Sequence, residues 1–445
     1  MTAIRTYHAQ HAIVDGAAAS DVRIDVDAGA IVAVQVGVRA TPGATPLPGL
    51  TLAGFANVHS HAFHRALRGR AQAGRGSFWT WRERMYELAG RLDPDRYHQL
   101  ARAVYAEMAL AGITCVGEFH YLHHAPGGAP YADPNEMGHR LIAAAQEAGI
   151  RITLLDTLYL TSTVEGGVLE GTQRRFGDAS VDAWAERVDR LRPGAPAHGR
   201  VGLAAHSVRA VPPEALSALA RHAGSDPVHI HLSEQRAENE ACLARYGRTP
   251  ASLLADAGLL GPHTTVVHAT HLSTGDIELL GRTRSSVCLC PTTERDLGDG
   301  IGPARALADA GSALCLGSDS HAVIDLIEEA RAMELDERLA AETRGHFAVS
   351  ELMAAATAQG HAALGWGDAG AIAVGGRADL VTVRLDTVRT AGYDDPAAAV
   401  VYAATAADVT DVIVDGEPIV HNGQHLRIPD VPAALDEAIR AVWTP

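Results

Sequence analysis

Residues 52–61, LAGFANVHSH, combine an apolar, β-rich run with two histidines at its end. Short apolar runs of this kind, bounded by polar residues, are typical of the buried strands of a parallel sheet. Each run in this chain is followed by an alanine-rich stretch with helical spacing. Seven more such runs follow the first: ITCVGEFHY (113–121), RITLLDTLYL (151–160), RVGLAAHSV (200–208), PVHIHLSE (227–234), TTVVHATH (264–271), SSVCLCPTTE (285–294) and SALCLGSDSH (312–321).

Eight strand–helix repeats predict an α/β fold, a closed (β/α)8 TIM-type barrel over residues 51–369. The two flanks have a different pattern, with short strands and turns at 22–36, 375–386 and 409–425. We expect residues 1–50 and 370–445 to join in one small β-sandwich domain beside the barrel. Histidines and acidic residues gather at the ends of the barrel runs, where barrel enzymes place their active sites.

The composition limits the partners of the protein. The formal net charge is −16 and the sequence contains no lysine, so its 37 basic residues are all arginine. Because nucleic-acid binding needs a concentrated basic patch, we predict no nucleic-acid partner. No stretch reaches the ~18 apolar residues of a membrane span, so we predict no membrane partner and a cytoplasmic location. The five cysteines form no CxxC pair and are predicted to be reduced core residues.

Four side chains are predicted to hold one divalent metal. His59 and His61 are two residues apart, so a strand points both to the same face. An HxH pair alone is weak evidence, but His231 and Asp319 stand at the ends of two other barrel runs. Three imidazoles and one carboxylate suit Zn²⁺, and Fe²⁺ or Mn²⁺ are also compatible. Barrel hydrolases with two metals commonly bridge them with a carbamylated lysine, so a chain without lysine favours one metal.

Two further residues are predicted to move protons for a water that the metal activates. Glu234 follows His231 by three positions, so its carboxylate can reach the reacting atoms without binding the metal. His268 ends the sixth run and is predicted to act with Asp319 on the proton of the attacking water. A buried structural histidine is the alternative for His268. The predicted catalytic residues are therefore Glu234, His268 and Asp319.

The sequence resembles the formimidoylglutamate deiminases of the amidohydrolase superfamily over nearly its whole length. HxH and GSDSH are shared by many deaminases, whereas FWTWRERMY, GEFHYLHH and PTTERDLGDG are more particular to these enzymes. The segments that carry the resemblance are NVHSHAFHRAL, SFWTWRERMY, VGEFHYLHH, AHSVRAV, HIHLSEQ, VHATHLS, LCPTTERDLGDG and GSDSH.

The resemblance implies hydrolysis of N-formimino-L-glutamate to N-formyl-L-glutamate and ammonia, in histidine degradation, by a homodimer. It implies the same metal ligands and the same proton-transfer pair. It also implies that Arg82, Tyr121, His206 and Arg209 hold the carboxylates of the substrate. Arginine binds a carboxylate through two parallel hydrogen bonds, so two arginines suit a small dianionic substrate. His64 stands where these enzymes usually have glutamine, and we include it among the substrate-binding residues.

Other functions remain compatible with the sequence. A deaminase of the same superfamily that acts on a purine, pterin or pyrimidine would need aromatic stacking groups and no paired arginines. His64 leaves open another N-formimino or carbamimidoyl derivative of an acidic amino acid. Cleavage of the other C–N bond would release formamide and glutamate from much the same site. A non-catalytic binding scaffold would be expected to have lost metal ligands, whereas every expected ligand is present.

Overall fold

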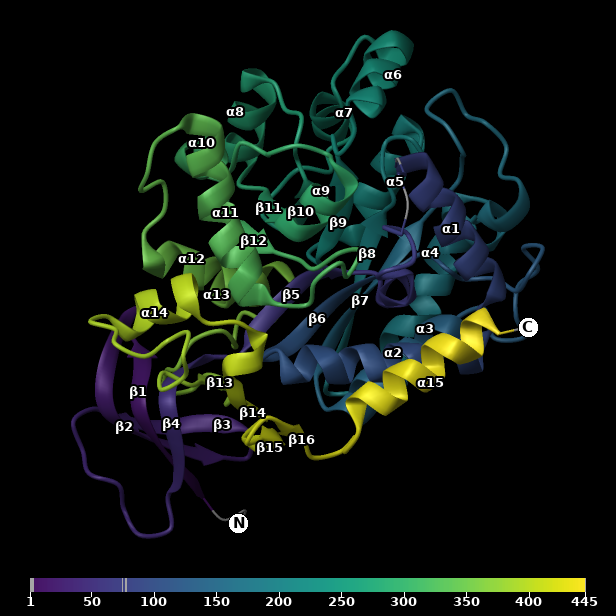
Figure 1. Ribbon diagram of the computed structural model, residues 1–445. Helices are drawn as coiled ribbons and strands as arrows, with labels where there is room; N and C mark the ends of the chain where they lie inside the picture. The colour runs from purple at the N-terminus through teal and green to yellow at the C-terminus, as the bar shows by residue number, and fades with distance from the viewer. Residues whose placement is uncertain (1–3, 74, 77, 445) are drawn as a thin grey trace.

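The computed structural model describes residues 4–73, 75–76 and 78–444, and one of its two eight-stranded sheets is built from parallel strands only (Figure 1). Each strand pairs with the next along the chain. The first and last strands meet where Ser60 forms a parallel bridge with Asp319, so the sheet closes. The strands are β5 (Phe55–Ser60), β6 (Ile113–His120), β7 (Arg151–Leu158), β8 (Gly199–Ala205), β9 (Val228–Leu232), β10 (Thr264–His268), β11 (Ser286–Leu289) and β12 (Leu314–Leu316). The predicted (β/α)8 barrel is confirmed.

Helices surround this barrel, because each strand must return to the same end before the next parallel strand begins. The α-helices are α1 (Phe78–Arg91), α2 (Pro94–Leu110), α3 (Glu136–Ala148), α4 (Val181–Leu191), α5 (Pro213–Ala223), α6 (Arg236–Tyr246), α7 (Pro250–Asp256), α8 (Thr274–Thr283), α9 (Pro291–Leu297), α10 (Ala304–Ala310), α11 (Leu326–Ala341), α12 (Val349–Ala356), α13 (Ala358–Ala363), α14 (Pro396–Ala403) and α15 (Val431–Trp443). Short 3-10 helices are η1 (Ala62–Leu67), η2 (Gly171–Arg175), η3 (Arg192–Gly194) and η4 (Ala406–Asp408).

Local sequence explains where these elements begin and end. All eight residues of β6 are buried, as expected for a parallel strand that is covered on both faces. Asp93 accepts a hydrogen bond from the Arg96 N–H and Pro94 opens α2, a favourable N-terminal combination. Gly149 ends α3 with a φ of 86°, a conformation that glycine adopts without a Cβ clash.

The second sheet is mixed and draws its strands from both ends of the chain. Figure 1 shows the purple N-terminal and yellow C-terminal segments side by side. Strand β4 leads the chain into the barrel and pairs with β1 on one side and β13 on the other. In spatial order the strands are β16 (Gln424–His425), β15 (Glu417–His421), β14 (Val409–Val414), β13 (Leu380–Val383), β4 (Thr45–Ala53), β1 (Arg5–Val14), β2 (Ala17–Asp27) and β3 (Ala30–Gln35). The expected separate β unit built from the two termini is confirmed.

A buried ion pair joins the barrel to this second sheet. Arg151, the first residue of β7, donates to both carboxylate oxygens of Asp379, at 2.8 and 3.0 Å, and both side chains are fully buried. Asp379 lies just before β13 and also accepts the Asp415 N–H. The Arg151 guanidinium lies over the ring of Trp366, 5.1 Å from its centroid. The two charges therefore neutralise each other inside the protein.

We predict that Arg151→Met lowers the free energy of unfolding by about 3–5 kcal/mol, because it leaves the Asp379 carboxylate buried without its counter-charge. Urea denaturation of the purified protein measures the change. Arg140→Met removes partly exposed ion pairs with Glu136 and Asp95 and serves as the control, with an expected change of at most about 1 kcal/mol. Equal stability of the two variants would contradict the role given to Arg151.

Candidate metal centre and active site

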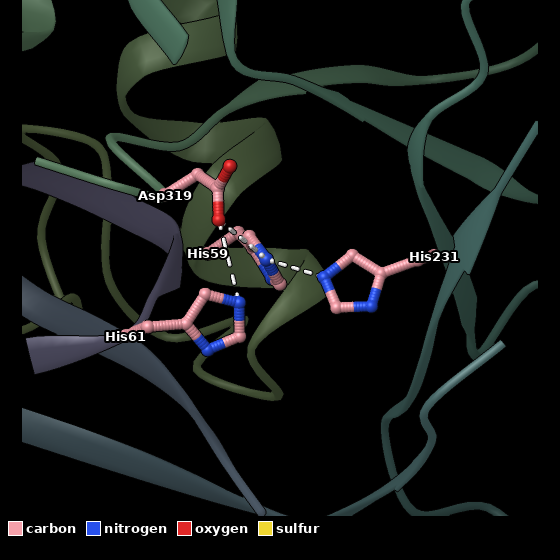
Figure 2. Close-up of side chains that lie close together, drawn as sticks. All are labelled: His59, His61, His231 and Asp319. Carbon is pink, nitrogen blue, oxygen red and sulfur yellow. Dashed lines mark hydrogen bonds and ion pairs between the residues drawn. The ribbon is translucent and has the colours of Figure 1, made fainter. Parts of the chain in front are cut away.

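Four of the predicted ligands converge at the C-terminal end of the barrel (Figure 2). His59 lies in β5 and His61 directly after it, His231 lies in β9, and Asp319 lies in the loop after β12. One ligand atom from each lies within 4.8 Å of all the others. Asp319 Oδ1 is 3.3 Å from the Nε2 atoms of both His59 and His61, and the Nε2 atoms of His59 and His231 are 3.0 Å apart.

The hydrogen bonds of His61 and His231 indicate which nitrogen of each ring carries the proton. His61 Nδ1 donates to the Phe119 carbonyl at 3.0 Å, and His231 Nδ1 donates to the His206 carbonyl at 2.8 Å. Burial lowers the pKa of His59, and burial together with neighbouring imidazoles lowers the pKa of His61 and His231 well below the usual value. In His61 and His231 a proton on Nδ1 leaves Nε2 as an acceptor, so both Nε2 atoms and the Asp319 carboxylate present lone pairs to the same region. A divalent cation fits this arrangement.

A buried polar network holds the two ligand-bearing segments together. Glu118 of β6 accepts hydrogen bonds from the Ser60 hydroxyl and the Ala62 N–H, both at 2.7 Å. The His321 ring lies within hydrogen-bond distance of Ser60 Oγ at 3.1 Å and Ser318 Oγ at 2.9 Å. These contacts connect β5 to the loop that carries the carboxylate ligand, which has a left-handed backbone at Asp319 with a φ of 39°.

The predicted proton-transfer residues lie beside the four ligands. His268 Nε2 is 3.8 Å from Glu234 Oε1 and 3.9 Å from Asp319 Oδ2. On the other side of the ring, His268 Nδ1 is 3.4 Å from Glu294 Oε1. Without a bound metal, burial would lower the pKa of His268, but Glu234, Glu294 and Asp319 together raise it well above the usual value. A divalent cation at the four ligands would oppose this increase, because a nearby positive charge disfavours the charged form of the ring. Burial raises the pKa of Glu234, against the opposing effect of His268.

The predicted substrate-binding residues line the same narrow cavity as the proton-transfer pair. His64 Nε2 and Tyr121 Oη are 3.0 Å apart, and Arg82 donates to the Tyr86 hydroxyl at 2.7 Å. Arg209 lies 3.7 Å from Glu238. Of the predicted site residues, all but the fully buried His59 line the cavity: His61, His64, Arg82, Tyr121, His206, Arg209, His231, Glu234, His268 and Asp319.

Sequence reasoning left open whether Trp81 is a wall residue or core, and it did not identify the other residues of this cavity. Its remaining lining is Trp81, Met85, Tyr86, Tyr159, Phe176 and Leu297. The signal for Trp81, Met85 and Tyr86 was their place in the segment that also contains Arg82, at helical spacing. Glu294, which contacts His268 without lining the cavity, stands in PTTERDLGDG, a segment quoted for the resemblance but given no role.

The family model described as Amidohydrolase family matches residues 50–419, most of the chain. The chain belongs to the amidohydrolase family. Like other members, this amidohydrolase is a metal-dependent hydrolase that acts on C–N bonds. In the described part of the chain, no helix is long and apolar enough to cross a bilayer.

Two curated relatives of this amidohydrolase come from Pseudomonas aeruginosa. Formimidoylglutamate deiminase is 37% identical over 431 residues, which cover 94% of this chain and 95% of that protein. The 8-oxoguanine deaminase is 30% identical, and the match covers 82% of this chain and 81% of that protein.

Two solved structures share the whole fold. A Brucella melitensis amidohydrolase has a TM-score of 0.92 and 33% identity, covering 99% of this chain and 100% of that one. An adenosine deaminase from Xanthomonas campestris, solved with bound zinc, has a TM-score of 0.84 and 25% identity, covering 99% of this chain and 98% of that one.

For this amidohydrolase we predict one metal ion per chain in the purified protein, measured by mass spectrometry of the metal. Asp319→Asn removes the only charged ligand and should reduce the metal content severalfold. His206→Asn is the matched control, because His206 touches His231 through its main-chain carbonyl, and it should keep the metal. Adding Zn²⁺ to chelator-treated wild type should raise its melting temperature, since a ligand of the folded state stabilises it. Full metal content in Asp319→Asn would contradict the assignment.

Proposed function

We propose that this amidohydrolase is a deiminase that hydrolyses N-formimino-L-glutamate to N-formyl-L-glutamate and ammonia. The observation that carries the proposal is the placement of two arginines, Arg82 and Arg209, in the cavity that also holds the metal ligands. The 37% identity to formimidoylglutamate deiminase over nearly the whole chain supports it. We propose Zn²⁺ as the metal, in agreement with the zinc of the adenosine deaminase structure, and a cytoplasmic homodimer acting in histidine degradation.

The arginines suit the two carboxylates of this substrate. Arg209 lies close to Glu238, but at 3.7 Å this contact leaves its hydrogen-bonding capacity largely unused. Its Nε is buried and has no hydrogen-bond partner within the described residues. A substrate carboxylate would provide that partner through a bidentate contact. Arg82, Tyr121 and His206 line the same cavity and complete the proposed carboxylate-binding groups, together with His64.

The proposed reaction breaks the C=N bond at the formimino carbon by addition of water and loss of ammonia. When bound by His59, His61, His231 and Asp319, a divalent metal supplies the Lewis acidity that activates water near neutral pH. The Nε2 face of His268 and the free Oδ2 of Asp319 lie on one side of the site and accept the proton of the attacking water. Glu234 donates a proton to the departing nitrogen. The formyl oxygen therefore comes from water, and the product keeps its bond to glutamate nitrogen.

A deaminase of cyclic substrates is the second candidate, and one observation favours it. Five aromatic side chains line the cavity: Trp81, Tyr86, Tyr121, Tyr159 and Phe176. However, the hydroxyls of Tyr86 and Tyr121 already contact Arg82 and His64, so these rings also serve polar groups. A neutral heterocycle has no carboxylates that the two arginines could bind. For this reason we prefer the dianionic substrate.

We expect the metal-loaded protein to release ammonia from N-formimino-L-glutamate, measured by a coupled ammonia assay, with no formamide detected by chromatography. Formamide release would show that the other C–N bond is cleaved. Turnover of guanine, 8-oxoguanine or adenosine without turnover of N-formimino-L-glutamate would replace the proposal with the second candidate. Preference for N-formimino-L-aspartate would point to a different acidic substrate and to His64 as its cause.

We predict that Glu234→Gln lowers kcat by about 10²–10⁴-fold, because the amide cannot deliver a proton to the leaving nitrogen. Its metal content should equal that of the wild type, since Glu234 is not one of the four converging ligands. Steady-state ammonia release and metal analysis on the same preparation measure both quantities. Near-normal turnover with a full metal complement would show that Glu234 does not have this role.

A further inference from the structure

The segment 290–299, CPTTERDLGD, contacts the proposed proton-transfer pair from the side opposite to the metal ligands. It follows β11 and contains α9. Glu294 is 5% exposed, and its Oε1 accepts the Cys290 N–H at 3.0 Å, which fixes the carboxylate at the start of the helix. The same oxygen lies 3.4 Å from His268 Nδ1. The segment therefore presents a fixed acceptor to the ring nitrogen that faces away from the reaction.

The end of the same segment contacts the other member of the pair indirectly. Asp299 accepts a hydrogen bond from the side-chain amide of Gln235, the residue next to Glu234. The Asp299 N–H donates to the Glu294 carbonyl at 2.9 Å, so the two acidic residues are held relative to each other. Within the described residues, Leu297 is the member of this segment that lines the cavity. Glu294 and Asp299 can therefore position the residues of the proton-transfer pair, but they do not line the cavity in which substrate would bind.

We propose that Glu294 is a positioning residue that holds the His268 ring with its proton on Nδ1, so that Nε2 faces the reacting water between Glu234 and Asp319. The proposal rests on the function proposed above. It assigns Glu294 no contact with substrate or metal.

The comparison with the other imidazoles of the site supports this assignment. His61 and His231 are oriented by hydrogen bonds from Nδ1 to main-chain carbonyls. His268 also needs an acceptor at Nδ1 to keep Nε2 as the free nitrogen, and the acceptor that the structure provides is the carboxylate of Glu294. The backbone at His268 has a φ of 70° and that at Ala269 a φ of 53°, so the ring leaves the strand end at a sharp turn. A ring that projects from such a turn needs a side-chain contact to fix its rotation.

The test compares Glu294→Ala and Glu294→Gln with Glu329→Ala as a matched control. Glu329 is also buried, and its carboxylate accepts from the Thr292 N–H and hydroxyl on the same helix α9, at 3.0 and 2.5 Å, without contacting His268. Glu329→Ala therefore also removes a contact that holds α9, but it leaves the contact between Glu294 and the His268 ring intact. Melting temperature and metal content are measured for all variants, so a general loss of structure is visible.

With N-formimino-L-glutamate as substrate, Glu294→Ala should lower kcat by about 10–100-fold, the usual effect of removing such an orienting partner. KM should change by less than about threefold and the metal content should stay at the wild-type level, because neither depends on the Nδ1 contact. Glu294→Gln should recover most of kcat, since its carboxamide oxygen can accept both N–H groups. Glu329→Ala should keep kcat near the wild-type value even if its melting temperature falls.

Equal kcat in Glu294→Ala and wild type would overturn the proposal, and so would an equal loss in Glu329→Ala or a failure of Glu294→Gln to recover activity. A wild type inactive on N-formimino-L-glutamate would instead contradict the proposed function.

The positioning role is then decided by ¹⁵N NMR of histidine-labelled protein, with the His268 signals assigned from His268→Asn. The metal-loaded wild type should show the Nδ1–H tautomer, and metal-loaded Glu294→Ala should show a mixture or the Nε2–H form. The same tautomer in both proteins would overturn the inference.

Discussion

The convergence of acceptor atoms at the end of the barrel is the constraint on which the site depends. The Nε2 atoms of His61 and His231 and the Asp319 carboxylate present lone pairs, so they cannot hydrogen-bond to one another. A cation satisfies them together. The same residues also close the barrel, because the bridge between Ser60 and Asp319 joins the first strand to the segment after the last. Barrel closure and metal binding therefore depend on the same two segments, the end of β5 and the loop that contains Asp319.

A network of hydrogen bonds around the ligands holds the ligand-bearing segments in position. Glu118 fixes Ser60 and Ala62, the neighbours of the two histidines on β5, and His321 connects Ser60 to Ser318. Burial raises the pKa of Glu118 to about 7, against hydrogen bonds that favour its charged form. The positive-φ backbone at Asp319 and at His268 concentrates local strain where the metal ligand and the proposed proton acceptor must face the same point.

Much of this could be predicted from the sequence, because the relevant signals are local. Eight apolar runs with polar ends predicted the barrel, and HxH and GSDSH predicted ligands whose positions at strand ends bring them together. The contact of Arg151 with Asp379 could not be predicted, since it joins positions 228 apart in two different sheets. The contact of Glu294 with His268 depends on how α9 turns back toward a neighbouring strand, and sequence spacing does not encode that turn. The roles given to individual site residues stay predictions.

The pairing of the two chain ends in one sheet has a consequence for biogenesis. Thr51 of β4 and Thr382 of β13 lie 331 positions apart, yet their hydroxyls are 3.0 Å from each other. At a synthesis rate of about 5–20 residues per second, β4 waits roughly 15–65 seconds on the ribosome before its partner strand has been made. During this interval its edge offers unpaired backbone groups to other nascent chains. Refolding of the full-length chain has no such interval, because both strands are present from the start.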